Sequence, residues 1–354
     1  MVIGSALAGL LAACGDAPAT AGTASASEGG DTASTSSGDT TGDASTTAGS
    51  AATTGDETGG SGSDSATTTS GATTTSTATS DATTAADTSG STTADTDGEA
   101  PSLCTETPTL VTCPKQTTDL EINALVTREV HWQVPLGDPP AAGWPIAVMF
   151  QGSLFTSELT WEGELGGGFG QYYQTLTLKR LLDAGYAVLT PEAHAQGNTF
   201  WDTNVPPYST NWELAPDHDF MLAIFAAIDD GVFGPLDSDA MYATGISSGG
   251  YMTSRMAVSY PGRFAGLAIQ SASYAPCSGP LCVIPDLDAS HPPTLFLAGA
   301  EDPIVPLSTV EAYHDALIAA TVHTELVVDE AAGHEWISAA PDAVLAWFDE
   351  HPPS

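Results

Sequence analysis

The chain has 354 residues, of which 44 are acidic and only 6 are basic, so its net charge at neutral pH is −38. A charge this negative disfavours nucleic acids, anionic lipid surfaces and polyanionic substrates as partners, and it suits a neutral or insoluble substrate. Thirteen acidic residues and no basic ones precede residue 101. The roughly 250 residues that follow are enough for one large core, so we expect one folded domain over 101–354.

The chain begins with a short apolar segment, MVIGSALAGLLAAC, over residues 1–14. It is too short to span a membrane. Leu11-Ala12-Ala13 followed by Cys14 resembles the lipobox of a bacterial lipoprotein signal, in which the cysteine is lipidated, but no Lys or Arg precedes it. The alternative is a plain secretory signal with a chance cysteine, and the missing charge leaves the true translation start open. Both alternatives predict export, with the protein held at a bacterial cell envelope or surface, or secreted.

Residues 15–100 contain only Gly, Asp, Ala, Pro, Thr, Ser and Glu. Such a segment lacks the apolar side chains that would offset the entropy lost on ordering. We therefore predict a disordered linker between the signal segment and the folded domain.

Four cysteines remain beyond Cys14, namely Cys104, Cys113, Cys277 and Cys282. An even number in an exported chain predicts structural disulfides. Three pairings are possible, and the short loops favour Cys104–Cys113 and Cys277–Cys282. No cysteine spacing resembles a zinc site, and we expect neither a metal nor an organic cofactor.

From about residue 125 short apolar runs alternate with longer amphipathic runs. Predicted strands cover 125–134, 145–153, 186–192, 240–247, 264–273, 293–300 and 324–330, and predicted helices cover 172–185, 215–231, 248–260, 306–320 and 341–351. This alternation predicts an α/β fold, with a mostly parallel central sheet and helices on both faces. The first two strands are expected to be neighbours.

A serine motif lies where the strand 240–247 meets the next helix. The sequence there is Gly245-Ile246-Ser247-Ser248-Gly249, and ligands of open α/β sheets bind at the carboxyl ends of strands. Glycines at 245 and 249 permit the tight turn that an exposed nucleophile requires. We predict Ser247 as the nucleophile, with the backbone N–H of Ser248 directed at a developing oxyanion.

A serine hydroxyl needs a base, and the base needs an orienting acid. Asp302 follows the strand 293–300, and His334 follows the strand 324–330. The order Ser, Asp, His at successive strand ends predicts a catalytic triad of Ser247, Asp302 and His334.

Other residues compete for these roles. Glu301 could be the acid, and Ser248 could be the nucleophile if the turn were shifted by one residue. Asp329 and Glu330 end a strand but are expected to face solvent or cap a loop. Among the other histidines, His194 and His218 are the closest rivals, while the rest lie within elements, at the wrong end of the sheet or in the tail: His131, His291, His314, His323 and His351.

These motifs resemble the α/β-hydrolase superfamily over roughly residues 120–350. GAEDPIVP, at 299–306, is similar to the Gly-x-x-Asp-x-x-Val-Pro loop of that superfamily, which favours Asp302 over Glu301. Residues 245–274 look like secreted polyhydroxyalkanoate depolymerases and related feruloyl or acetylxylan esterases. The triad spacing and the CSGPLC stretch at 277–282 are most similar to the medium-chain-length depolymerases.

The resemblance also implies the surroundings of the nucleophile. The backbone N–H of Ser153 would be the second oxyanion donor, and Gln151 stands where many relatives have His, next to the substrate. No separate C-terminal polymer-binding module is evident, so polymer would contact a patch near the site. We predict that the loop 197–212 forms this patch through Trp201, Tyr208 and Trp212, with capping of the core as the alternative.

The sequence as a whole therefore predicts an exported, lipid-anchored and monomeric serine esterase that acts on a neutral polyester such as polyhydroxyalkanoate. An esterase acting on feruloyl or acetyl groups of plant polysaccharide is the first alternative. A peptidase with the same triad and a non-catalytic binding module with a hydrolase fold are the others.

Overall fold

The computed structural model describes residues 101–193, 199–277 and 283–353. Several predicted features lie outside the described residues: the signal segment 1–14 with Cys14, the linker 15–100, the rival histidine His194, and Cys282, the predicted partner of Cys277. No helix within the described ranges has both the length and the apolar character needed to cross a bilayer.

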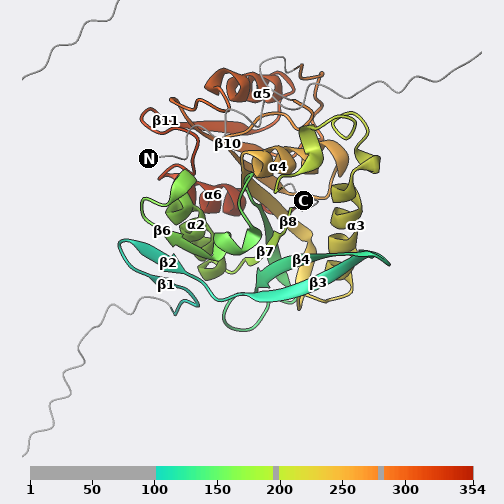
Figure 1. The fold of residues 1–354 in the computed structure, drawn as a ribbon, viewed down its shortest axis with the longest axis vertical. Helices are drawn as coiled ribbons and strands as arrows, with labels where there is room; N and C mark the ends of the chain where they lie inside the picture. Colours follow the sequence, from blue (N-terminus) through green and yellow to red (C-terminus); the bar gives the residue numbers. More distant parts are fainter. Residues whose placement is uncertain (1–100, 194–198, 278–282, 354) are drawn as a thin grey trace, which may run out of the picture. The chain divides into compact units, whose positions relative to one another are not determined.

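A twisted sheet of eight strands forms the centre of the described domain (Figure 1). Its strands, in spatial order, are β11 (Thr324–Asp329), β10 (Thr294–Gly299), β9 (Gly266–Gln270), β8 (Leu236–Ile246), β5 (Trp144–Phe150), β7 (Ala187–Pro191), β4 (Val126–Gln133) and β3 (Gln116–Asn123). The six strands from β11 to β7 are parallel, and β4 and β3 are antiparallel to their neighbours. This confirms the predicted fold class, a mostly parallel sheet in an α/β domain.

Apolar side chains cover both faces of the sheet, as the continuous apolar runs predict. In β5, Ala147 and Met149 point into one core, whereas Ile146, Val148 and Phe150 point into the other. All five side chains are at most 1% exposed. The strand is therefore buried on both sides, and helices must cover both faces.

Within the described residues, five α-helices provide that cover (Figure 1): α2 (Gln171–Asp183), α3 (Pro216–Asp229), α4 (Ser248–Ser259), α5 (Leu307–Ala319) and α6 (Ala340–Glu350). Leu178 of α2 and Phe348 of α6 pack into the core on one face, and Phe220 of α3 and Met252 of α4 pack into the core on the other. A third cluster lies beneath α5, whose Tyr313 is fully buried.

The structure differs from the sequence prediction at the start of the domain. The strands β4 and β5 are not neighbours, because β7 lies between them. β3 was not predicted, and neither was a small antiparallel sheet made of β1 (Thr105–Glu106), β2 (Leu110–Thr112) and β6 (Glu162–Glu164). Cys104 and Cys113 flank β1 and β2 and form the predicted disulfide. Cys277 is also a disulfide cysteine, but its predicted partner Cys282 is outside the described residues.

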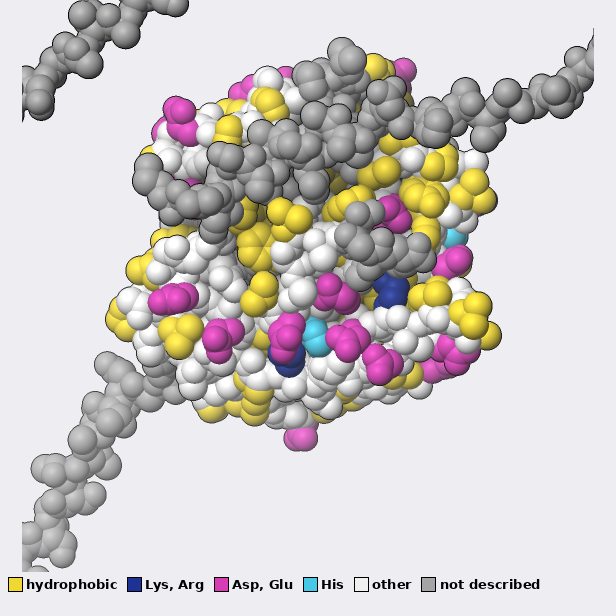
Figure 2. Space-filling view, in the orientation of Figure 1, with side chains coloured by type: hydrophobic (Ala, Val, Ile, Leu, Met, Phe, Trp, Pro, Cys, Tyr) yellow, Lys and Arg dark blue, Asp and Glu magenta, His cyan; other side chains and the backbone are white. Residues whose placement is uncertain are grey.

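The surface of the domain carries the acidic excess of the sequence. Figure 2 shows Asp and Glu side chains scattered over one face, with Lys and Arg visible at only a few places. The basic side chains are partly withdrawn from the surface, since Arg128, Lys179 and Arg255 are 3–7% exposed.

Candidate active site

The sharp turn between β8 and α4 holds Ser247 in a conformation that non-glycine residues rarely adopt, with φ 57° and ψ −122°. Such strain persists only where the surrounding structure imposes it. A Cβ on Gly245 would lie 2.6 Å from the carbonyl oxygen of Gly249, and a Cβ on Gly249 would collide with the carbonyl oxygens of Phe150 and Gln151. The two glycines therefore let the strand, the helix and the end of β5 approach one another closely, as predicted.

Ser247 is the partly exposed serine of the pair, whereas Ser248 is 8% exposed. The Ser248 hydroxyl is buried and has no hydrogen-bond partner among the described residues. Ser248 is the first residue of α4, and the first N–H groups of a helix have no partner within it. The side chain of Ser247 and the backbone N–H of Ser248 thus both lie at the N-terminus of α4.

Asp302 and His334 lie in the loops that follow β10 and β11, and their side chains meet. Nδ1 of His334 and Oδ2 of Asp302 are 2.8 Å apart, with side chains that are 5% and 1% exposed. The other carboxylate oxygen, Oδ1, accepts backbone N–H groups of Ile304 at 2.8 Å and Val305 at 2.9 Å. The carboxylate is therefore fixed on one side by the backbone and holds the imidazole on the other.

The loop that carries His334 is attached to the end of β9, beside the serine turn. The backbone N–H of Ser247 donates to the carbonyl of Gln270 at 3.1 Å. The Gln270 side chain accepts the N–H of Ile337 at 3.4 Å, and the hydroxyl of Ser271 donates to the carbonyl of Glu335 at 3.3 Å. Two residues that follow His334 in its loop, Glu335 and Ile337, thus contact the end of β9, which also binds the backbone of Ser247.

The loop after β5 also lies beside Ser247. A Cβ built on Gly152 would be 3.8 Å from Cβ of Ser247, which places the predicted oxyanion loop directly beside the serine. Leu154 has φ 71°, and its N–H donates to the carbonyl of Thr199 at 2.9 Å. This N–H is therefore occupied, while Ser153, the predicted donor, is partly exposed.

The sequence did not single out Phe169, whose ring lies beside the imidazole of His334, or Phe155, which packs against Phe169. The ring of Phe169 is edge-on to His334, with centroids 5.9 Å apart, and also contacts Phe155 at 5.3 Å. Phe169 has φ 58°, and its carbonyl accepts the N–H of Trp336. Nearby, Leu154 is 52% exposed. These apolar side chains form an apolar rim around the site. The sequence signal that could have indicated this rim is the glycine-rich stretch around Phe169.

The prediction that Trp201 and Trp212 form an exposed patch is wrong. They are 0% and 7% exposed, because each indole ring packs in the core beside a buried arginine. Arg128 lies 5.5 Å from the ring of Trp201, and Arg255 lies 5.0 Å from the ring of Trp212. Tyr208 is half-buried and packs against the same core. The alternative, in which these aromatic side chains cap the core, describes them correctly.

Gln151 is also not a surface for substrate. It is 1% exposed, and every polar side-chain atom contacts the protein. Its Nε2 donates to the carbonyl of Phe155 and to Glu192, and its Oε1 accepts the N–H of Ala193 at 3.1 Å. The indole of Trp201 donates to the Gln151 carbonyl at 3.1 Å. These contacts hold the predicted oxyanion loop in place.

The remaining rivals lie elsewhere or are occupied. Glu301 is exposed, unlike Asp302. His218 contacts the hydroxyl of Tyr260 at 2.9 Å, and His291 contacts that of Tyr313 at 2.7 Å. Within the described ranges, no three His, Cys, Asp or Glu side chains gather as a metal site.

A strained serine between β8 and α4, with an Asp–His pair in the loops after β10 and β11 of a mostly parallel sheet, defines an α/β hydrolase. Comparison with known proteins then narrows the class. The chain is 48% identical over 261 residues to the poly(3-hydroxyoctanoate) depolymerase of Pseudomonas fluorescens, covering 72% of this chain and 92% of that protein. The chain belongs to the family of this depolymerase and is a carboxylic ester hydrolase, which confirms the predicted family and enzyme class.

Other similarities are more distant. A protein family described as TAP-like matches residues 273–349. Among solved structures, the acylaminoacyl peptidase of Pyrococcus horikoshii is 13% identical with a TM-score of 0.48, covering 70% of this chain but 42% of the peptidase. A carboxylesterase of Bacillus cereus is 15% identical with a TM-score of 0.46, covering 65% of this chain and 96% of the esterase. Likenesses this low carry no argument about activity.

Proposed function

We propose that the protein hydrolyses the ester bonds of a polyhydroxyalkanoate through an acyl-enzyme on Ser247. The observation that carries the proposal is the buried Asp302–His334 hydrogen bond, in a histidine loop that contacts the same end of β9 as the strained turn of Ser247. The depolymerase relative supports a polyester as the substrate, and the apolar rim around Phe169 suits an aliphatic one. A strongly acidic surface also suits a neutral polymer.

The chemistry proceeds in two halves. The Ser247 oxygen attacks the ester carbonyl while Nε2 of His334 accepts its proton, and Asp302 holds Nδ1–H and stabilises the imidazolium. The carbonyl oxygen becomes an oxyanion that the N–H groups of Ser248 and Ser153 stabilise. When this tetrahedral intermediate collapses, the ester C–O bond breaks, and His334 protonates the departing alkoxide. Water, deprotonated by the same imidazole, then releases the hydroxyacid and restores the serine.

A labelling experiment tests the mechanism. A fluorophosphonate probe should label the wild-type protein, and Ser247→Ala should abolish labelling while leaving the fold intact by circular dichroism. Failure of the wild type to label would favour a non-catalytic binding module. Labelling of Ser247→Ala at the wild-type rate would assign the nucleophile to another residue.

A substrate panel tests the specificity. Films of poly(3-hydroxyoctanoate) should release hydroxyacid oligomers faster than feruloyl or acetyl polysaccharide releases ferulate or acetate. Peptide amides should be cleaved poorly. Release of ferulate or acetate without polymer erosion would replace the polyester by plant polysaccharide.

We also propose the arrangement of the whole chain. Residues 1–14 are a signal segment, Cys14 carries a lipid, residues 15–100 form a flexible linker, and residues 101–354 act as a monomeric catalytic domain. The disulfide Cys104–Cys113 supports export, because such bonds persist in oxidising compartments. Metabolic labelling with a fatty acid should mark the wild-type protein but not Cys14→Ser, and light scattering of the purified protein should give the monomer mass.

A further inference from the structure

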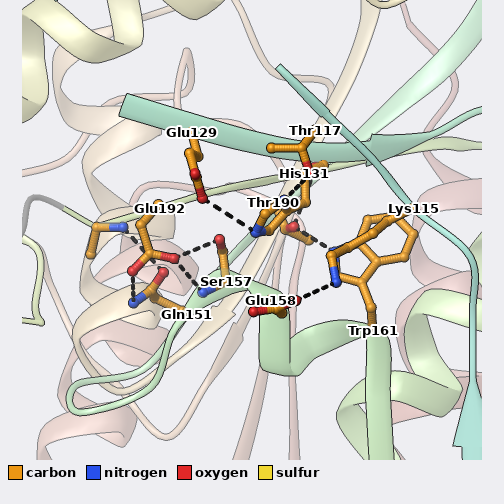
Figure 3. Close-up of polar contacts among 11 residues, drawn as sticks. Lys115, Thr117, Glu129, His131, Gln151, Ser157, Glu158, Trp161, Thr190 and Glu192 are labelled. Atoms are coloured by element: carbon orange, nitrogen blue, oxygen red, sulfur yellow. Dashed lines mark hydrogen bonds and ion pairs between the residues drawn. The ribbon is translucent and has the colours of Figure 1, made fainter. Parts of the chain in front are cut away.

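Glu192 lies directly after β7, and its carboxylate contacts both ends of the loop that carries the proposed oxyanion donor (Figure 3). At the start of the loop, Oε1 accepts Nε2 of Gln151 at 3.3 Å. At the end of the loop, Oε2 accepts the backbone N–H of Ser157 at 2.6 Å and its hydroxyl at 2.7 Å. One side chain thus ties residue 151 to residue 157, with Ser153 between them.

All the partners of this carboxylate are donors, which suits an ionised acid. A carboxylate offers only acceptors, and hydrogen bonds to it are shorter and stronger than those between neutral groups. A glutamine at position 192 would keep one oxygen for Ser157 but would turn its NH₂ toward the NH₂ of Gln151. Two donors would then face each other at the start of the loop.

The main chain of Glu192 is itself held firmly. Its N–H donates to the carbonyl of Glu129 at 2.9 Å. Its carbonyl accepts two guanidinium N–H groups of Arg128, at 2.7 and 3.2 Å, and the same guanidinium makes a buried ion pair with Asp217 at 2.7 Å. The carboxylate therefore braces the loop from a fixed point of the sheet, and the loop's own Leu154 is held in a left-handed conformation.

We propose that Glu192 is a positioning residue that sets the oxyanion loop, so that the Ser153 N–H meets the charge that develops in the transition state. This inference rests on the proposed function. An oxyanion donor acts mainly in the transition state, so its displacement lowers kcat more than it raises KM. Loss of one such donor costs about 10²–10³ in kcat, which is the upper limit for Glu192.

The test compares Glu192→Gln with the wild type in the full chain, using p-nitrophenyl octanoate. We expect kcat to fall by about 10- to 100-fold, below that limit, with KM changed less than about threefold. Affinity for a trifluoromethyl ketone, which forms a tetrahedral oxyanion on the serine, should weaken by a similar factor. Binding of a non-reactive ether analogue should not change. A merely structural role would not separate these two inhibitors.

Two further variants keep the test decisive. Glu158→Gln is the matched control, since Glu158 follows Ser157 in the chain and its exposed carboxylate forms an ion pair with Lys115 at 3.0 Å; its kcat should equal that of the wild type. Ser157→Ala removes one bond to the carboxylate and should give a smaller loss of kcat than Glu192→Gln. If circular dichroism shows that Glu192→Gln is unfolded, the kcat of Ser157→Ala decides whether the positioning role holds.

The outcomes separate the two claims. If the wild type hydrolyses esters and labels at Ser247 but the folded Glu192 and Ser157 variants keep kcat within about twofold, the positioning role is wrong and the proposed function stands. Equal weakening of both inhibitors also overturns the role. A wild type that neither labels nor hydrolyses esters overturns the proposed function, and the inference with it.

Discussion

Replacing Asp302 by asparagine tests the proposed triad at its best-defined contact. The carboxylate accepts two backbone N–H groups on Oδ1 and the imidazole on Oδ2. Asparagine can keep its oxygen toward the backbone, because the reverse orientation would set its NH₂ against two N–H donors. Its NH₂ must then face Nδ1 of His334, which becomes an acceptor. The proton moves to Nε2, and the imidazole can no longer accept the proton of Ser247.

The expected loss follows from the tautomer. A wrongly protonated histidine in such a triad lowers kcat by about 10³–10⁴, which corresponds to about 4–5.5 kcal/mol of transition-state stabilisation. The free energy of unfolding should change by less than about 1 kcal/mol, since the backbone hydrogen bonds remain. Asp302→Ala should lose as much activity and also about 1–3 kcal/mol of stability, because the N–H groups of Ile304 and Val305 lose their acceptor.

The assay combines hydrolysis of p-nitrophenyl octanoate with urea unfolding followed by tryptophan fluorescence. Both variants are compared with the wild type in the same buffer. If Asp302→Asn keeps more than a tenth of the wild-type kcat, Asp302 does not control the tautomer of His334, and the reasoning fails.

Three further predictions use the same two assays. Gly249→Ala should destabilise the protein by about 1–3 kcal/mol and lower kcat, because its Cβ collides with the carbonyl of Phe150, and a variant as stable as the wild type would contradict the tight turn. Ser153→Ala keeps its backbone N–H, so kcat should stay within about twofold, and a hundredfold loss would mean that the hydroxyl acts instead. Burial, with the nearby charge of Asp217, raises the pKa of Asp202 to about 6. The folded state therefore holds this proton more tightly, and the stabilisation present below about pH 4 is lost as the pH rises through 6. Asp202→Asn should add about 1 kcal/mol more stability at pH 8 than at pH 4, a figure reduced for solvent screening, and an equal effect at both pH values would refute the assignment.

The strands and helices around the site were predictable because their apolar runs are continuous. β10 is buried throughout and β8 is buried from Ala240 to Ile246, and the two strands lead straight into the loops of Asp302 and Ser247. β3 escaped prediction because it lies at the sheet edge, where only Leu120 is buried. A strand with one buried side chain has almost no apolar pattern to detect.

The site was predictable only where the chemistry is local or ordered along the chain. The glycines around Ser247 specify the turn by their spacing, and the Asp–His pair follows from strand order. Burial of Trp201 depends on Gln151 and Arg128, which lie 50 or more residues away. In the sequence, Glu192 is likewise only an acidic residue that follows a strand, and its role depends on Ser157, which the fold brings into hydrogen-bond distance. Contacts of this kind have no signature in a single sequence.

The left-handed conformation of Ser247 matters for attempts to increase the thermal stability of the enzyme. A residue forced into this region costs about 1–3 kcal/mol, and glycine adopts it without penalty. A screen that selects variants by thermal stability alone would therefore favour Ser247→Gly, which lacks the hydroxyl. Directed evolution of this protein should therefore select for turnover in every round, because stability and activity oppose each other at the turn that holds the proposed nucleophile.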